Sequence, residues 1–305
     1  MAVQDYAKYD ALGLAELVAN RDVTAAELVE EAITRAERVN PQLNAIAYKA
    51  YDAARASVER GLPKGRFSGV PFFLKDILAF ATDMPTRQGT GFMPPIPWGQ
   101  DSNLVARYRA AGLAILGKTN VPEFGLVPTT ESRLYGPAHN PWNLDHSTGG
   151  SSGGSAALVA ASVVPMAHAN DGGGSIRIPA SCCGLLGLKP TRGRVSYGPD
   201  FGDAVDGLSI DHVVSRSVRD SAAALDATQG NVQGDPYWAP PAPASYLEEI
   251  KSAPKQLRIA YATKSLDGKS VHPDCVAAVE KAAKLCESLG HIVEEASPSV
   301  DLSSL

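Results

Sequence analysis

Two clusters of glycine and serine contain the residues best suited to chemistry, and a run of small apolar residues separates them. The first cluster, residues 149–155, contains Ser151, and the second, residues 172–175, ends in Ser175. A flexible linker has no need of the apolar run between them. The glycines are better explained as positions where backbone N–H groups approach a ligand closely. Ser151 and Ser175 are therefore candidate active-site residues.

A serine hydroxyl is a good nucleophile only when a base accepts its proton. Lys75 is a candidate for that base because it follows the apolar run Val70–Leu74, which predicts a buried strand. Burial lowers the pKa of a lysine from about 10.4 toward neutrality. On the residues alone, a surface pair between Lys75 and Asp76 explains the lysine equally well. Glycines 172–174 supply successive N–H groups for an oxyanion, or they form a tight turn.

Two short motifs suggest other chemistries, and the residues around them argue against both. Residues 112–119 fit the phosphate-loop pattern G-x-x-x-x-G-K-[ST], but their middle residues, Leu-Ala-Ile-Leu, predict a strand. Residues 149–153 fit G-x-S-x-G, the nucleophile elbow of α/β-hydrolases, which needs an apolar strand before it. Residues 141–148 predict a loop there instead.

The six histidines offer neither a metal site nor a clear catalytic base. They show no metal-ligand spacing, and each is expected at the surface or at the edge of the core. His212, His272 and His291 follow both serines in the chain, so an esterase with a Ser-His-Asp triad stays open as an alternative. Replacing its histidine would abolish such an activity, whereas replacing Lys75 would not.

Composition and charge argue against several classes of protein. The 305 residues carry 28 basic and 33 acidic side chains without a basic run, so nucleic acid is not an expected partner. No apolar run has the length of a membrane span, and the N-terminus does not resemble a signal peptide. Cys182 and Cys183 are adjacent in an apolar segment and are expected to be buried free thiols. We expect a cytoplasmic protein that does not bind membranes.

Predicted helices and strands alternate along the chain. This alternation predicts an α/β fold with a mixed, largely parallel central sheet covered by helices on both faces. Helices are expected over residues 11–20, 25–40, 50–60, 103–111, 155–162, 217–228 and 272–289. Strands are expected over residues 44–48, 70–74, 114–117, 163–167, 185–188, 257–262 and 292–294. Asp10 and Thr24 are predicted helix caps, and Pro41 is predicted to end the second helix.

The ordered set of motifs resembles the amidase-signature hydrolase family. Residues 149–190 are similar to the signature of that family, and the Lys75-Asp76 strand end and the tracts 117–125 and 140–143 match it as well. The likeness is collinear through Arg194 and more diffuse beyond it. It implies the amidase-signature fold over a single domain.

The resemblance also implies how that domain is divided. Residues 1–60 form an N-terminal helical region, residues 61–230 the catalytic core, and residues 231–305 a peripheral strand–helix segment. Family members usually continue well past the point where this chain ends. The chain is therefore expected to be truncated at its C-terminus, with an incomplete sheet.

By resemblance, the catalytic group is a Ser–cis-Ser–Lys triad. Ser175 takes the place of the nucleophile, Ser151 that of the bridging serine after a cis peptide bond, and Lys75 that of the base. The resemblance implies an acyl-serine intermediate and requires neither a metal nor a cofactor.

The resemblance assigns the remaining site residues to glycines. The oxyanion is expected on the N–H groups of Gly172, Gly173, Gly174 and Ser175, and Gly125 is expected on the substrate side. Position 172 more often holds Thr or Ile in the family, so the glycine is a departure from the pattern.

The implied activity is hydrolysis of a small aliphatic, aryl or oligomeric amide to an acid and an amine. Residues 168–171 and 177–181 most resemble the branch that contains nylon-oligomer (6-aminohexanoate cyclic dimer) hydrolases, which favours linear or cyclic amides. The expected partner is a small-molecule amide, with a homodimer as a further possibility. An amidotransferase A-type subunit, which passes ammonia to a partner enzyme, and an inactive truncated scaffold remain as alternatives.

Overall fold

A computed structural model gives the fold and describes residues 3, 5–242, 244–267 and 269–298. The chain forms two compact units, Met1–Ile250 (unit 1) and Lys251–Leu305 (unit 2). Every site residue predicted from the sequence belongs to unit 1. The single-domain division into residues 1–60, 61–230 and 231–305 stays a prediction.

Unit 1 begins with the 3-10 helix η1 (Tyr6–Lys8) and the helices α1 (Ala11–Asn20) and α2 (Ala25–Leu43). Both predicted caps are confirmed: Asp10 accepts from the Gly13 N–H, and Thr24 forms a capping box with Glu27. The prediction that Pro41 ends α2 is wrong, because the helix continues to Leu43. A proline so near a helix end removes only one N–H from the last turn, and α2 closes where Asn44 turns left-handed at φ 46°.

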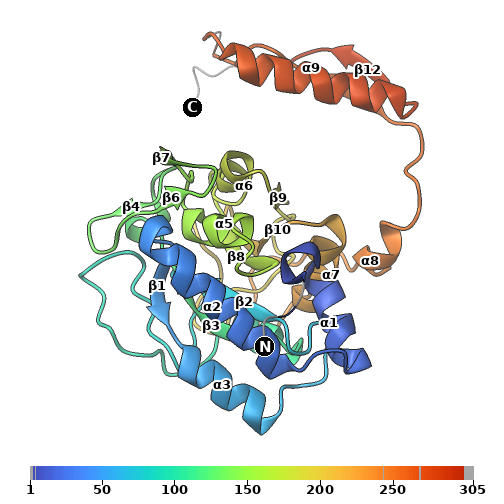
Figure 1. Cartoon of the computed structure of the whole chain (residues 1–305). Coiled ribbons are helices and arrows are strands. Elements are labelled where there is room, and N and C mark those ends of the chain that lie inside the picture. The colour runs from blue at the N-terminus through green and yellow to red at the C-terminus, as the bar shows by residue number, and fades with distance from the viewer. Residues whose placement is uncertain (1–2, 4, 243, 268, 299–305) are drawn as a thin grey trace. The chain divides into compact units, whose positions relative to one another are not determined.

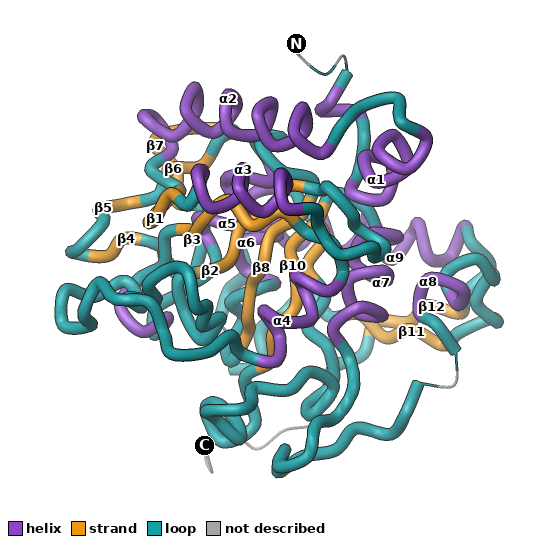
Figure 2. The backbone as a smooth tube through the Cα atoms, turned by 90° about the horizontal axis from the view of Figure 1, so that it is seen from below, coloured by secondary structure: helices purple, strands orange, loops and turns teal. Residues whose placement is uncertain are grey.

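Two three-stranded sheets form the centre of unit 1. One has the order β1 (Ile46–Lys49), β3 (Ala114–Thr119), β2 (Pro71–Lys75), and the other β8 (Met166–Asp171), β10 (Ile210–Ser215), β9 (Leu186–Gly187). Figure 2 shows β3, β2, β8 and β10 side by side, and β2 contacts β8. The pair β2/β3 is parallel, whereas β1/β3, β8/β10 and β9/β10 are antiparallel. The mixed α/β class is confirmed, with more antiparallel pairing than the alternation of elements predicts.

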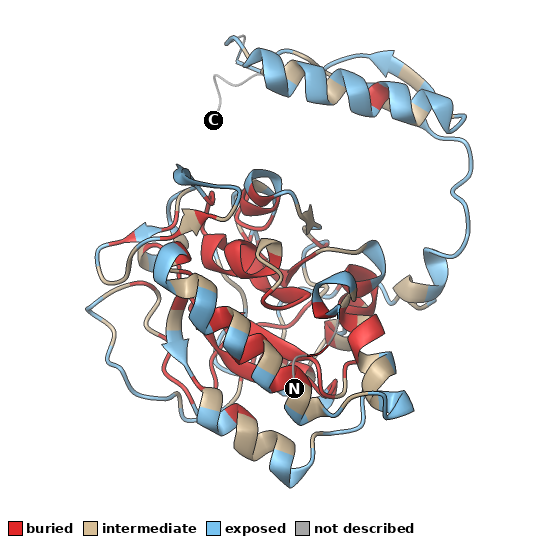
Figure 3. Cartoon of the chain, in the orientation of Figure 1, coloured by how far each residue is buried: buried red, intermediate tan, exposed pale blue. Residues whose placement is uncertain are grey.

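Helices cover these strands. The helices of unit 1 after α2 are α3 (Tyr51–Arg60), α4 (Asn103–Ala110), α5 (Gly153–Ala160), α6 (Arg177–Cys183), α7 (Val218–Thr228) and α8 (Tyr246–Glu249), of which α4 and α8 pack on α7. Helix α2 packs on β2 and β3, and α5 packs on β2, β8 and β10 (Figure 1). The core follows these contacts, with β2, β8 and most of α5 buried (Figure 3).

The strand predicted at residues 163–167 is displaced toward the C-terminus. Residues 163–165 are a buried turn, and β8 begins at Met166. Val163 and Val164 are as completely buried as the strand, so an apolar run alone does not tell a strand from a buried turn.

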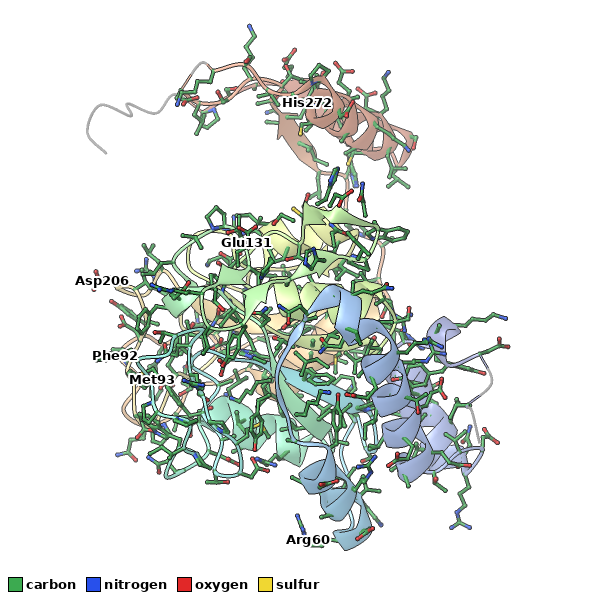
Figure 4. The ribbon with its side chains drawn as sticks, turned by 60° about the vertical axis from the view of Figure 1, so that its left-hand side comes forward. Arg60, Phe92, Met93, Glu131, Asp206 and His272 are labelled. Atoms are coloured by element: carbon green, nitrogen blue, oxygen red, sulfur yellow. The ribbon has the colours of Figure 1, made fainter. Side chains whose placement is uncertain are left out.

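Short hairpins and loops lie between β3 and α5. The elements are η2 (Glu123–Gly125), the pair β4 (Glu131–Ser132) and β5 (Gly136–Pro137), and the pair β6 (His139–Asn140) and β7 (Asn143–Ser147). The prediction of a loop at residues 141–148 is wrong in part, because β7 is a strand. All of its residues are exposed, so it is not the buried apolar strand that a nucleophile elbow requires. The Pro- and Gly-rich segment 83–101 is a loop, and Phe92 lies at its outer edge (Figure 4).

Unit 2 contains β11 (Arg258–Tyr261), α9 (Pro273–Ser288) and β12 (Ile292–Glu295). Strands β11 and β12 pair in parallel, and His272 caps α9. Within the described ranges, no helix combines the length and the apolar content that a membrane crossing requires.

Two expectations about buried side chains are corrected. Cys182 is exposed and only Cys183 is buried, although both are free thiols. His168 and His212 are buried in the core rather than placed at its edge. The His168 Nδ1 accepts a hydrogen bond from the Lys75 backbone N–H, and the His212 Nε2 is hydrogen-bonded to the Ser221 hydroxyl. These bonds offset the free-energy cost of burying a neutral imidazole.

Candidate active site

Lys75 is the last residue of β2, a strand that is buried along its whole length. Its amine lies inside the protein, 2.7 Å from the hydroxyl oxygen of Ser151 and 2.6 Å from the side-chain oxygen of Asn170. The surface pair between Lys75 and Asp76 does not form. Asp76 is itself buried and accepts from the Arg87 N–H and the Tyr135 hydroxyl.

Burial lowers the pKa of Lys75 to about 7, and the carboxylates of Asp211 and Asp171 only partly oppose this effect. A charged amine loses hydration when it is taken out of water, so the neutral form becomes accessible near neutral pH. A neutral amine has a lone pair and is able to accept a proton from Ser151. Lys75 therefore has the position and the pKa of a general base.

His168 connects the strand that ends in Lys75 to the neighbouring strands. Its Nδ1 accepts from the backbone N–H of Lys75 at 3.0 Å, so Nε2 carries the proton and donates to Asp211 at 3.0 Å. This bond pattern requires a neutral imidazole, and burial lowers the pKa of His168 in the same sense. The histidine thus fixes the end of β2 against β8 and β10.

Ser151 lies in the turn between β7 and α5. The Gly150–Ser151 peptide bond is cis, as the family resemblance implies. Thr130 holds the turn at both ends, because its hydroxyl donates to the Gly149 carbonyl at 3.0 Å and accepts from the Gly153 N–H at 3.1 Å. The turn directs the Ser151 hydroxyl toward Lys75.

Ser175 lies in the loop that follows β8, and Asp171 organises this loop. The Asp171 carboxylate accepts from the N–H groups of Gly174 (2.7 Å) and Ile176 (3.2 Å), and Arg177 pairs with both of its oxygens. Burial alone would raise the pKa of Asp171, but the Arg177 guanidinium and these N–H groups outweigh it and lower the pKa. The carboxylate therefore stays ionised and holds the loop in one shape.

The same bond changes the expected oxyanion site at one position. Because the Gly174 N–H already donates to Asp171, it is not free for an oxyanion. The N–H groups of Gly172, Gly173 and Ser175 make no hydrogen bond within the described part of the chain. These three groups are the available oxyanion donors.

A pocket of about 550 Å³ lies over both serines. Ser151, Asn170, Gly172, Gly173 and Ser175 contribute to its lining, whereas Lys75 lies behind Ser151 and does not. The other lining residues are mostly apolar: Ile77, Leu78, Phe124, Leu126, Val127, Pro128, Ile178, Ala204 and Val205, with Gln88 and Ser209 as polar members. Lys75 is thus able to exchange a proton with a molecule in this pocket only by way of the Ser151 hydroxyl.

Gly125 lies in the pocket wall next to Ser151. Its φ is +69°, and a side chain would bring a Cβ within 3.1 Å of the Ser151 hydroxyl oxygen. Only glycine adopts this conformation without strain and leaves Ser151 free to face the pocket. The structure thus places Gly125 in the pocket lining, and its position on the substrate side stays a prediction.

The phosphate-loop pattern at residues 112–119 has a structural explanation. Most of it is the buried strand β3, as predicted, and Lys118 points into the core. Lys118 donates to the Ala79 carbonyl and to the Thr86 hydroxyl, and burial lowers its pKa to about 8. This lysine anchors the loop after β2 and offers no cradle for a phosphate.

The alternative of a Ser-His-Asp esterase is not supported by the pocket, because no histidine is among its described lining residues. His212 is bonded to Ser221 at 2.9 Å, but both side chains are buried and neither lines the pocket over Ser151 and Ser175. Burial lowers the pKa of His212 to about 3, and its Nδ1 has no acid partner within the described residues. His272 and His291 belong to unit 2. The pocket therefore favours Lys75 as the base.

The sequence reasoning missed four residues that shape the site: Asn170, Asp171, His168 and Asp211. Asn170 and Asp171 precede the second glycine cluster and belong to the tract 168–171 that carries the family resemblance, but neither signal assigns them a role at the site. His168 and Asp211 lie on separate strands, so no local pattern in the sequence pairs them.

The fold and this site belong to a known class. Residues 27–304 match the Amidase family model, and the chain therefore belongs to the amidase family. Among solved structures, the 6-aminohexanoate cyclic dimer hydrolase complexed with substrate superposes with a TM-score of 0.92 at 41% identity, over 96% of this chain and 61% of that one. A bacterial aryl acylamidase of the amidase signature family gives a TM-score of 0.85 at 31% identity, over 95% and 61% of the two chains.

Curated relatives agree with the structural comparison. The chain is 44% identical over 294 residues to the 6-aminohexanoate-cyclic-dimer hydrolase of Paenarthrobacter ureafaciens, which covers 95% of this chain and 59% of the relative. It is 40% identical to a putative amidase of Synechocystis sp., over 99% of this chain and 60% of the relative. The chain thus spans about three fifths of the length of the curated relatives it matches.

Proposed function

We propose that the protein hydrolyses an uncharged carboxylic amide to an acid and an amine through an acyl intermediate on Ser175. The observation that carries this proposal is the bond between the buried amine of Lys75 and Ser151, next to a pocket that Ser175 also lines. Membership of the amidase family supports the same reaction class.

The proposed reaction begins with a proton relay. Neutral Lys75 accepts the proton of Ser151, and Ser151 accepts the proton of Ser175 as its Oγ attacks the carbonyl carbon. The carbonyl oxygen becomes an oxyanion, which the free N–H groups of Gly172, Gly173 and Ser175 stabilise.

The second half of the proposed reaction reverses the relay. Ser151 passes a proton, replaced from Lys75, to the leaving nitrogen, and the C–N bond breaks to release the amine. Water then attacks the acyl-Ser175 ester and gives its proton to the same relay. The ester C–O bond breaks, Ser175 regains its proton, and the acid leaves.

The lining of the pocket indicates the substrate class. Among the described residues that line it, none is charged. A charged group on a substrate would lose hydration there without gaining a partner. We infer that the groups next to the scissile bond are neutral and apolar, as they are in acyclic aliphatic amides, aryl amides and cyclic amides. Free glutamine, the ammonia source of an A-type subunit, carries two charges and fits this lining poorly.

A substrate panel tests the proposal. We expect release of a primary amine, measured by fluorescent derivatisation, from uncharged aliphatic, aryl or cyclic amides, including the 6-aminohexanoate cyclic dimer. Release of ammonia from glutamine alone would favour the amidotransferase alternative. A folded protein that cleaves no amide and no ester would overturn the proposal for this chain.

Gly172 is expected to set the width of the pocket. A Cβ at this position would lie 3.6 Å from the Ser209 Cβ and 3.8 Å from the Val205 Cγ2, in van der Waals contact with two other residues of the pocket lining. Larger side chains would bridge the gap that glycine leaves open. For Gly172→Thr we expect kcat/KM for bulky acyl groups to fall at least about tenfold relative to acetyl amides.

The series Gly172→Ala and Gly172→Thr gives an internal control, because both variants keep the backbone N–H at this position. The ratio of kcat/KM for bulky and acetyl substrates should fall in order of side-chain size. An equal loss for all acyl groups would mean that the substitutions disturb the oxyanion loop rather than the width of the pocket.

A further inference from the structure

The side chain of Asn170, on β8, is buried beside Lys75 and lines the pocket. Its Oδ1 accepts from the lysine amine at 2.6 Å, and this is the one hydrogen bond of the side chain within the described residues. The amide nitrogen, Nδ2, is buried there without a partner. Within the described residues, the Asn170 side chain therefore forms hydrogen bonds with a single group, the amine of the candidate base Lys75.

A buried asparagine with a structural role is able to use both ends of its amide, although Asn120 also leaves its Oδ1 without a partner within the described residues. Asn140, which is equally buried, is an example: its Nδ2 donates to the carbonyls of Ser147 and Cys182, and its Oδ1 accepts from the Trp142 N–H. Leaving a buried donor unsatisfied costs about 1–3 kcal/mol. At Asn170, the side chain that bears this cost makes its one hydrogen bond within the described residues to Lys75, which points to a role at the candidate base.

The geometry of the two bonds specifies what Asn170 does to the lysine. An amide oxygen only accepts, so it takes an N–H of Lys75 whether the amine is charged or neutral. The neutral amine has two N–H bonds and one lone pair. With one N–H held by Asn170, the amine is able to place its lone pair on Ser151, 2.7 Å away. Without that acceptor, the amine is free to turn and donate to Ser151 instead, an orientation in which it is unable to take the proton.

We propose that Asn170 is a positioning residue, which holds the amine of Lys75 so that its lone pair faces Ser151. The inference rests on the proposed function, because it assigns a role within the same proton relay. Asn170 touches neither the Ser151 hydroxyl nor the Ser175 hydroxyl by any hydrogen bond within the described chain, so it acts through Lys75.

Two substitutions of Asn170 test two effects separately: the orientation of the Lys75 lone pair and the charge of the Lys75 amine. Asn170→Asp keeps an acceptor at the same place but adds a negative charge, which favours the ammonium form of Lys75. We expect the acidic limb, the fall in the rate of Ser175 modification at low pH, to move up by about one to three pH units.

Asn170→Ser is too short to reach the amine. The ammonium form loses an acceptor, so the acidic limb should stay in place or move to lower pH. The plateau should fall on the order of tenfold to a hundredfold, because part of the contribution of the general base is lost. The other groups that face Lys75, namely Asp171, His168 and Asp211, are the same in both variants.

The readout is the rate at which a sulfonyl fluoride modifies Ser175, followed by peptide-resolved mass spectrometry from pH 5 to pH 10. The titration of Lys75, followed by NMR of 13C-labelled lysine, gives its pKa in each variant without reference to any rate. Circular dichroism checks that each variant is folded. Asn140→Ser serves as the matched control, with an expected loss of thermal stability and an unmoved acidic limb.

The outcomes separate this inference from the proposed function. If Ser175 reacts, and its reaction depends on Lys75, the relay exists. In that case, the positioning role alone would be overturned if both Asn170 variants kept the labelling rate and the acidic limb of the unaltered protein. If Ser175 does not react in the unaltered protein, the proposed function fails for this chain. An unchanged Lys75 pKa in Asn170→Asp would still refute the inference in that case.

Discussion

Ser175→Ala is expected to abolish both amide hydrolysis and labelling by a sulfonyl fluoride. The Ser175 hydroxyl lines the pocket and makes no hydrogen bond within the described residues, so the substitution removes the nucleophile and little else. Loss of the nucleophile from a catalytic triad costs on the order of a millionfold in kcat. Thermal stability should change little, because no buried partner is left unsatisfied.

Ser221→Ala is the matched control for this experiment. Ser221 is a buried serine bonded to His212 and does not line the pocket, so its replacement removes a serine hydroxyl without changing the proposed site. Its replacement should leave the labelling of Ser175 intact. Activity that survives in Ser175→Ala and disappears in Ser221→Ala would reverse the assignment of the nucleophile.

Local patterns made the three residues of the proposed relay candidates, and the family resemblance gave them their expected roles. Lys75 follows an apolar strand, and Ser151 and Ser175 belong to glycine clusters. The structure brings Lys75 and Ser151 into hydrogen-bond contact and places Ser151 and Ser175 along one pocket. A sequence motif identifies such residues because their positions depend on the backbone within a few residues of them.

The supporting residues were not accessible, because they depend on which strands become neighbours. His168 serves Lys75 only because β8 lies beside β2, and Asp211 serves His168 only because β10 pairs with β8. Strand order and register are properties of the whole sheet, and no window of sequence contains them. The same reason explains why Asn170 received no role from its sequence position.

The errors in the predicted elements have a different origin. Pro41 and the turn at residues 163–165 show that local signals fix the type of an element better than its ends. The glycine loop contains an N–H group that the fold itself uses, and the sequence does not show which one. Its conformation depends on Asp171, whose carboxylate takes the Gly174 N–H that the sequence assigns to the oxyanion.

Lys75→Met is expected to remove activity as severely as the loss of Ser175, and to stabilise the protein in acid. In the unaltered protein, the rate should fall about tenfold per pH unit below the Lys75 pKa of about 7, because the base is then charged. Methionine fills a similar volume but is unable to take a proton, so the residual rate should have no such limb. Substantial activity of Lys75→Met at neutral pH would exclude the lysine as the base.

The stability effect has a defined dependence on pH. Burial lowers the Lys75 pKa from its ordinary value to about 7, so between these two values the unfolded chain binds more protons than the folded chain. Stability of the unaltered protein therefore rises with pH across that window, by about 1.4 kcal/mol per unit for this group. Below pH 7 the full penalty of the buried charge is present, and the stabilising effect of methionine should be largest there.

Melting temperatures of both proteins at pH 6 and pH 9 test this linkage. The difference in favour of Lys75→Met should be large at pH 6 and should shrink at pH 9, where the lysine is mostly neutral and its bonds to Ser151 and Asn170 count against the variant. Lys118→Met is the control, because it removes another buried lysine and should leave the acidic limb of the rate in place. A difference that is equal at both pH values would mean that Lys75 does not titrate near neutrality, and the proton relay would then lack its base.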